Sequence, residues 1–340
     1  MARRAFRPLE ERKHLTGLVA VIALLPLALH GGQLREPTRP KIGLALGGGS
    51  APGLSHLGVL KWLEEHRIPV DFVAGTSMGG LVGGLYATGH KPAEIEEFVR
   101  QIDWEDALRI GLAYSHLTYR RREDLRQFPN RLEIGVKHGM QLPAGLSAGH
   151  RVGLVLSRFT SPYAGLRTFD DLPIPFRAVA TNLVNGEQVI FDRGSLFDAL
   201  RSTMALPGIF TPWKVGAMVL VDGGLLNNLP VDVVRKMGAD VVIAVVMEKP
   251  PVGSKELESI LGVTGRAVDV MILNQEKRSM ALADLVVAPD LQGFASDDFK
   301  RAPELAQRGS MAAGSSRIGA ELPASPTSAP GYVLSIHTDV

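Results

Sequence analysis

The chain has 340 residues, no cysteine and a formal net charge of +2. The lack of cysteine excludes disulfides, thiolate metal sites, iron–sulfur clusters and a cysteine nucleophile, and the small net charge argues against nucleic acid as the main partner. Hydrophobic residues make up 45% and charged residues 21% of the chain, so most of it should fold, and one large domain with appendages is the simplest interpretation of its length.

The first 40 residues have the pattern of a targeting segment. Five Arg or Lys residues between Arg3 and Lys13 precede an apolar run at 15–29, which is typical of an export signal. No small-x-small cleavage site follows, so an uncleaved membrane anchor is a second interpretation and a buried helix a third. We therefore expect residues 1–40 to be a signal or anchor plus linker, and the protein to be exported: periplasmic, membrane-anchored or secreted.

Between residues 41 and 313, apart from a more polar stretch at 90–175, the sequence alternates between apolar strands and helices. Strands are predicted at 42–46, 70–74, 176–182, 188–191, 218–221, 241–246 and 285–288. Helices are predicted at 54–66, 78–88, 196–205, 230–238 and 255–281, with a last helix that ends near 313. This alternation predicts an α/β fold of three layers, with a central, mostly parallel sheet and helices on both faces.

Two further regions are expected to lie outside this regular pattern. Residues 90–175 are more polar, and their basic cluster at 120–122 is interpreted as a solvated face. Residues 314–340 are rich in Ser, Ala and Pro, which predicts a low-complexity tail after a catalytic domain at 41–313.

Ser77 is the candidate nucleophile. It lies in Gly75-Thr76-Ser77-Met78-Gly79, between a predicted strand and a predicted helix. This setting is the one that a G-x-S-x-G nucleophile elbow requires, because side chains at Gly75 and Gly79 would clash in the strained turn. The helix N-terminus behind Ser77 also favours the negative charge that develops on acylation. The motif therefore predicts acyl transfer through Ser77.

A second strand-to-helix turn contains Gly47, Gly48 and Gly49 in the segment GGGSAPG at 47–53. The N–H groups of such a loop can approach an oxyanion or a phosphate. The lysine of a P-loop is missing, and Pro52 stands at the last position of a dinucleotide-binding motif, so nucleotide binding is the weaker interpretation. A tight turn without a further role is the third.

Asp222 ends a predicted hydrophobic strand and is followed by Gly223 and Gly224. Its carboxylate can serve as the base for a serine without an intervening histidine, although a plain turn aspartate is the alternative. A Ser-His-Asp hydrolase needs a histidine after the acid, and only His337, in the expected tail, follows Asp222. His56 is interpreted as a satisfied structural histidine. No metal-binding spacing is present, so no metal and no other cofactor is expected.

In order and spacing, the three segments at 47–53, 75–79 and 222–224 resemble those of the patatin-like phospholipase family. The similarity covers 41–313, including the segments 57–60, 205–212 and 227–231, and looks closest to exported bacterial members around 103–104 and 176–181. It implies a serine lipid acyl hydrolase of phospholipase A or esterase type that has a Ser77–Asp222 dyad and no cofactor.

The same resemblance assigns the oxyanion hole to the N–H groups of Gly48 and Gly49, with Gly47 as a further donor, and the dyad loop to Gly223 and Gly224. The implied partners are a phospholipid or other acyl-ester lipid and a membrane surface. The sequence does not indicate an oligomeric state.

One residue departs from the family pattern. Pro52 stands where many bacterial members have Arg or Lys, and proline supplies neither a charge nor an N–H group. A catalytically silent domain that binds lipid is therefore the alternative function, and the contribution of this position to head-group binding is open.

Overall fold

The chain folds around an eight-stranded sheet with the strand order β10-β9-β1-β2-β4-β8-β7, in which β5 also pairs with β4. This computed structural model describes residues 39–102, 104, 145–147, 149–248, 257–258 and 260–322. The expected export segment (apart from its last two residues), the basic cluster at 120–122 and His337 lie outside the described residues. In the described part of the chain, no helix has both the length and the apolar character that a membrane span needs.

Seven of the eight strands of the main sheet match predicted strands to within two residues at each end, and β7 is not predicted by the sequence pattern. They are β1 (Ile42–Leu46), β2 (Phe72–Thr76), β4 (Phe176–Asn182), β5 (Glu187–Phe191), β7 (Trp213–Val215), β8 (Met218–Asp222), β9 (Val241–Val245) and β10 (Leu285–Val287). A separate two-stranded sheet pairs β3 (Gly145–Ser147) with β6 (Gly208–Phe210).

The helices connect and cover these strands. They are α1 (Ser55–Glu65), α2 (Met78–Ala87), α3 (Pro92–Gln101), α6 (His150–Thr160), α7 (Leu196–Thr203), α8 (Gly224–Asn227), α9 (Val231–Lys236), α10 (Ile260–Met280), α11 (Ala302–Ser315) and α12 (Ile318–Glu321). Short 3₁₀ turns are η1 (Ala51–Leu54), η3 (Ser161–Tyr163), η4 (Phe169–Asp171) and η6 (Phe299–Arg301).

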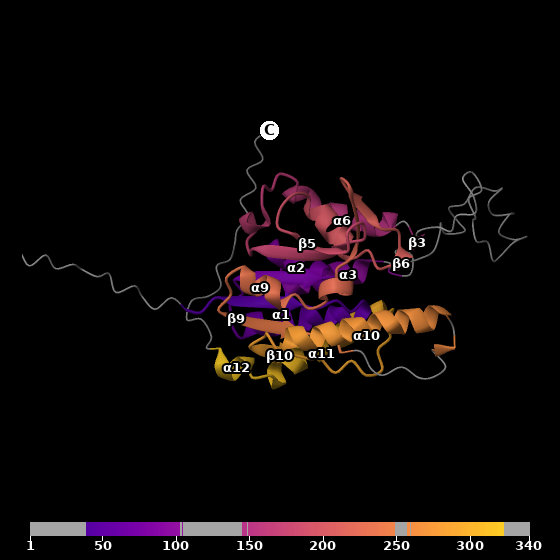
Figure 1. The fold of residues 1–340 in the computed structure, drawn as a ribbon. Helices are drawn as coiled ribbons and strands as arrows, with labels where there is room; N and C mark the ends of the chain where they lie inside the picture. The colour runs from indigo at the N-terminus through magenta and orange to yellow at the C-terminus, as the bar shows by residue number, and fades with distance from the viewer. Residues whose placement is uncertain are drawn as a thin grey trace, which may run out of the picture. The chain divides into compact units, whose positions relative to one another are not determined.

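Helices on both faces of the sheet make three layers, because consecutive residues of a strand point to opposite faces. In β1, Leu44 belongs to a core that includes residues of α1, α2, α3, α7 and α11, whereas Ala45 belongs to a second core with residues of α9. In Figure 1 the early indigo elements lie between the magenta and the orange ones, as the strand order requires. The predicted three-layer α/β fold is confirmed.

The packed fold extends past residue 313, where the sequence pattern places the end of the domain. Ile318 in α12 is fully buried and Leu322 is nearly so, and both belong to the larger core. The apolar residues of this short stretch are spread among Ser, Gly and Ala, which hides the pattern of a packed helix. The low-complexity tail from residue 323 lies outside the described residues.

Strand β4 is the junction between a parallel and an antiparallel half of the sheet. It pairs in parallel with β2 along 176–179 and antiparallel with β8 along 180–182. Because β5 pairs with β4 along 178–182, which overlaps both stretches, β2 and β8 must share the other side of β4. These two strands therefore run toward each other, and their carboxyl ends meet beside Val179 and Ala180.

Candidate active site

Ser77 occupies a sharp turn between β2 and α2 that only glycine neighbours permit. Its φ of 54° and ψ of −124° are unusual for a residue with a side chain. A Cβ atom at Gly75 would lie 2.3 Å from the carbonyl oxygen of Gly79, and one at Gly79 would lie 2.4 Å from that of Leu46. The elbow geometry expected of this motif is therefore present, and main-chain atoms on both sides fix it.

A hydroxyl from α7 fixes the turn further. The N–H group of Ser77 donates to Oγ1 of Thr203 at 2.9 Å, and this hydroxyl donates in turn to the carbonyl oxygen of Val179 at 2.5 Å. All three residues are buried. Since Val179 is also the partner of the last residue of β2, the serine is anchored to the strand that carries the junction.

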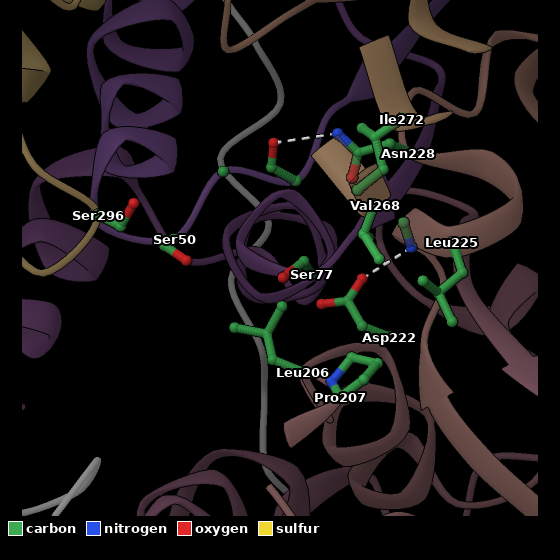
Figure 2. Close-up of a pocket in the computed structure, with 13 residues that line it drawn as sticks. Ser50, Ser77, Leu206, Pro207, Asp222, Leu225, Asn228, Val268, Ile272 and Ser296 are labelled. Carbon is green, nitrogen blue, oxygen red and sulfur yellow. Dashed lines mark hydrogen bonds between the residues drawn. The ribbon is translucent and has the colours of Figure 1, made fainter. Parts of the chain in front are cut away.

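Asp222 reaches the same place from the opposite direction as the last residue of β8. It pairs with Ala180, and its Oδ1 accepts a hydrogen bond from the N–H group of Gly224 at 2.8 Å. A Cβ atom at Gly223 would lie 2.4 Å from the carbonyl oxygen of Val179, so this turn also requires glycine. Figure 2 shows the carboxylate directed toward the hydroxyl of Ser77.

A pocket of about 90 Å³ contains both side chains. Its walls also include the glycine-loop residues Gly48, Gly49 and Ser50, the apolar residues Leu206, Pro207, Leu225, Val268 and Ile272, and Gly224, Asn228 and Ser296. In Figure 2, Leu206 and Pro207 lie on one side of the serine and Val268 and Ile272 on the other. Ser77 and Asp222 themselves are 6% and 3% exposed. An ester in this pocket would meet a hydroxyl and a carboxylate within mainly apolar walls.

The three glycines at 47–49 differ in the use of their N–H groups. That of Gly47 donates to the carbonyl oxygen of Val245 at 3.0 Å, and that of Gly48 donates to the carbonyl oxygen of Asn228 at 3.2 Å. The N–H group of Gly49 has no acceptor among the described residues. Of the three expected oxyanion donors, the N–H groups of Gly47 and Gly48 are therefore already used in main-chain hydrogen bonds. The third, that of Gly49, remains available, and Gly49 lines the pocket.

His56 lies behind the glycine loop rather than in the pocket. It is fully buried in α1, and its Nε2 donates to the carbonyl oxygen of Gly47 at 2.7 Å. Burial lowers the pKa of this imidazole to about 4, so the ring is neutral at pH 7. Its Nδ1 has no hydrogen-bond partner among the described residues, so this structural histidine is only half satisfied.

Ser50 and Pro52 complete the glycine loop. Ser50 has a φ of 51° and a ψ of −136°, close to the values of Ser77. Pro52 lies in the first turn of η1, where an N–H group would have no acceptor within the helix, so proline fits there. Among the described residues, no three His, Asp or Glu side chains are grouped as metal ligands.

Several residues of the site are not evident from the sequence. Thr203 ends an ordinary amphipathic helix, and Val268 and Ile272 belong to α10, far along the chain from Ser77. Asn228 lies in one of the segments that resemble the family, although nothing in the sequence indicates that it contacts Gly48. These contacts depend on how distant strands are placed, which the local pattern does not encode.

Comparison with known proteins adds a family to this geometry. The sequence profile of the patatin-like phospholipase family matches residues 44–235, more than half of the chain. An uncharacterised NTE-family protein of Mycobacterium tuberculosis is 29% identical over 286 residues, which cover 81% of this chain and 71% of that protein.

Two eukaryotic proteins match a smaller share of their own length. The lysophospholipase NTE1 of Debaryomyces hansenii is 30% identical over 208 residues, 60% of this chain and 12% of the fungal protein. The mouse patatin-like phospholipase domain-containing protein 6 is 33% identical over 261 residues, 76% of this chain and 17% of the mouse protein.

Proposed function

This chain belongs to the patatin-like phospholipase family, and on that premise we propose that it hydrolyses acyl esters of phospholipids or related lipids with a Ser77–Asp222 dyad. Family membership makes it a lipid hydrolase in the broad sense. The single observation that carries the finer proposal is the meeting of β2 and β8 beside consecutive residues of β4, which brings a serine and a carboxylate into one pocket.

The dyad divides ester hydrolysis into two steps. Oγ of Ser77 attacks the carbonyl carbon while Asp222 takes the hydroxyl proton, and the tetrahedral adduct then expels the alcohol, which receives that proton. Water next attacks the acyl-enzyme and gives a proton to Asp222, which returns it to Ser77 as the fatty acid leaves. No histidine is needed, since the carboxylate faces the hydroxyl directly (Figure 2).

Gly49 supplies the oxyanion donor in this mechanism. Its N–H group has no acceptor among the described residues, whereas those of Gly47 and Gly48 already donate to carbonyl oxygens. Gly48 lies against the nucleophile, because a Cβ atom there would be 3.0 Å from Cβ of Ser77. The loop is therefore close enough to the reacting carbonyl, and loss of one such donor typically costs about 100-fold or more in rate.

The alternative is a catalytically silent domain that binds lipid. Its motivation is Pro52, which lacks the charge of the usual Arg or Lys. Pro52 is accommodated in η1 without disturbing Ser77 or Asp222, and it does not line the pocket. The geometry therefore favours the enzyme, and the missing charge bears on head-group choice rather than on acyl transfer.

Turnover of phosphatidylcholine and lysophosphatidylcholine tests the proposal. The wild type should release fatty acid, Ser77→Ala should lose all measurable turnover, and Asp222→Asn should lose about 100- to 10,000-fold, because its amide can no longer take the proton. Ser50→Ala is the matched control, because it removes a second hydroxyl from the same pocket, and it should remain active. Equal, negligible turnover by the wild type and Ser77→Ala would favour the silent domain.

The membrane contact of this function falls on α10. One face of the helix exposes Val263, Val270 and Met271, which are 52%, 44% and 64% exposed, while Val268 and Ile272 line the pocket. Lys277 and Arg278 are exposed at its C-terminal end. An apolar face with cationic residues at one end suits an interface with anionic lipid.

Co-sedimentation with phosphatidylglycerol vesicles tests this contact. Met271→Gln should weaken binding about 10-fold, because a methionine side chain that enters the interface contributes about 1.5 kcal/mol. Met311→Gln on α11 is the matched control, since Met311 is 60% exposed, and it should bind like the wild type. Equal binding by the two variants would remove α10 as the contact surface.

A further inference from the structure

We propose that Asn228, which is held by Gln275 and Glu276 of α10, is the positioning residue that turns the N–H group of Gly49 toward the reacting carbonyl. The inference rests on the proposed function, because an oxyanion donor matters only if Ser77 acylates. It adds a set of residues whose role is to decide which way the glycine loop faces, not to react with the ester.

Asn228 forms hydrogen bonds with both main-chain polar groups of Gly48, the N–H group and the carbonyl oxygen. Its carbonyl oxygen accepts the N–H group of Gly48 at 3.2 Å, and its side-chain Nδ2 donates to the carbonyl oxygen of Gly48 at 3.3 Å. The dashed line at Asn228 in Figure 2 marks the second of these bonds. One residue thus contacts the donor and the acceptor of a single glycine, 180 positions away in the sequence.

The orientation of Gly49 follows from the planarity of the peptide bond. In a trans peptide the carbonyl of one residue and the N–H group of the next point in opposite directions. Because the carbonyl of Gly48 points to Asn228, the N–H group of Gly49 points away from it. Without the Asn228 side chain, no hydrogen bond from the described residues would hold this peptide in that orientation.

Helix α10 in turn fixes Asn228. Oε1 of Gln275 accepts the main-chain N–H of Asn228 at 3.0 Å, and Oε1 of Glu276 accepts its Nδ2 at 2.5 Å. Glu276 is 3% exposed and Asn228 is 5% exposed. Since both known partners of Nδ2 are acceptors, they also fix which way the amide faces. Buried hydrogen bonds of this kind are costly to break, because each loss leaves a polar group without a partner.

The side chain of Asn228 is also packed closely against two glycines of the site. A Cβ atom at Gly48 would lie 2.5 Å from Oδ1 of Asn228, and one at Gly224 would lie 2.8 Å from the same atom. The amide therefore lies between the glycine loop and the dyad loop. Helix α10 contributes Val268 and Ile272 to the pocket wall and, one turn on, the two residues that hold Asn228.

The decisive variant is Asn228→Ala, with Asn227→Ala as its matched control. Asn227 is likewise 5% exposed, but its Nδ2 donates to Oδ1 of Asp232 at 2.7 Å and its side chain does not line the pocket. With a soluble acyl ester, Asn228→Ala should lower kcat by about 10- to 100-fold with KM within about twofold, since a misplaced donor costs the transition state and not the substrate complex. Asn227→Ala should keep kcat within about threefold.

A trifluoromethyl ketone with an alkyl chain gives a readout that a purely structural role would not move. Ser77 adds to its carbonyl and forms an anionic adduct that needs the same donor as the transition state. Its inhibition constant should rise in proportion to the fall in kcat for Asn228→Ala and stay near the wild-type value for Asn227→Ala. A full kcat for Asn228→Ala, or an equal loss in both variants, would overturn the inference.

Glu276 supplies the second test. Glu276→Gln retains an acceptor for Nδ2 and should keep kcat within about threefold, whereas Glu276→Leu should fall with Asn228→Ala. In the Asn228→Ala background, Glu276→Leu should add less than about twofold, because the two act as one unit. Multiplied losses would show that Glu276 acts elsewhere and would overturn its role. Failure of the proposed function is distinguishable, since the wild type itself would then lack Ser77-dependent turnover.

Discussion

The two serines that follow β1 and β2 have almost the same backbone conformation in different surroundings. Ser50 has a φ of 51° and a ψ of −136°, and Ser77 has a φ of 54° and a ψ of −124°. Both line the pocket, and both adopt angles that disfavour a side chain. The strain is similar, yet only Ser77 is the proposed nucleophile.

The difference lies in what holds each turn. The Ser77 turn is enclosed by main chain at Gly75 and Gly79, whereas Cβ atoms at Gly49 and Gly53 would meet the side chains of Met247 and Met78 at 2.7 Å. The two carbonyl groups that Cβ atoms at Gly75 and Gly79 would meet belong to α2 and β1 and move only with the main chain. The atoms met at Gly49 and Gly53 are Cβ and Cγ of methionine, of which Cγ can move by rotation of the side chain. Main chain therefore fixes the Ser77 turn, whereas the glycine loop meets side chains at these two positions, which agrees with the proposed role of Asn228 in holding that loop.

The largest effect should come from filling the two turns with a methyl group. Gly79→Ala places Cβ 2.4 Å from the carbonyl oxygen of Leu46 and should lower the free energy of unfolding by about 4 kcal/mol or more, or prevent folding. Gly53→Ala meets Cβ and Cγ of Met78 at 2.7 Å instead, and should cost about 1 to 3 kcal/mol as overpacking against a side chain. Urea unfolding measures both. Similar losses in the two variants would mean that the turns are equally rigid.

His56, behind the glycine loop, should make stability depend on pH. Its pKa is about 4 in the folded chain and 6.5 in the unfolded one, so only the unfolded chain gains a proton between these values. The free energy of unfolding should therefore fall by about 3 kcal/mol from this group as the pH drops from 6.5 to 4. His56→Gln keeps a donor for Gly47 and should lose that part of the slope. Parallel pH profiles for the two proteins would contradict the buried neutral imidazole.

The smallest effect should come from relieving the strain itself. Ser50→Gly and Ser77→Gly each remove a side chain from unfavourable angles and should each raise the free energy of unfolding by about 1 kcal/mol, after the entropy cost of glycine. Only Ser77→Gly should abolish turnover. Thermal unfolding with an ester assay checks both, and a loss of stability in either variant would show that its hydroxyl makes contacts worth more than the strain.

Much of the fold can be predicted from the sequence, because the strands of the parallel half of the sheet are marked by local runs of apolar residues. The strand at 42–46 matches its predicted bounds, and that at 241–246 differs by one residue, since continuous apolar runs are typical of strands buried on both faces. The direction of β8 is not encoded in its residues, so its head-on approach to β2 is not predictable. Helices α3 and α6 are also not predicted, because they lie in the polar stretch at 90–175, where no apolar periodicity is assigned.

The site divides in the same way. Ser77, Asp222 and the glycine loop can be proposed from the sequence because each lies at or just after the end of a strand with glycines beside it, which local sequence reveals. Local sequence does not reveal which N–H group of the loop is already hydrogen-bonded. The acceptors for Gly47 and Gly48 are Val245 and Asn228, which lie nearly 200 residues away. Which donor is left over depends on the assembled sheet.

The most direct test of the account is the intact mass of the protein after treatment with an alkyl fluorophosphonate, in which Ser77 displaces fluoride from phosphorus and retains the phosphonyl group. One adduct should form on the wild type, one on Ser50→Ala and none on Ser77→Ala, with much slower labelling of Asp222→Asn. An adduct on Ser77→Ala that forms as fast as on the wild type would contradict the role of Ser77 and would assign the nucleophile to another residue.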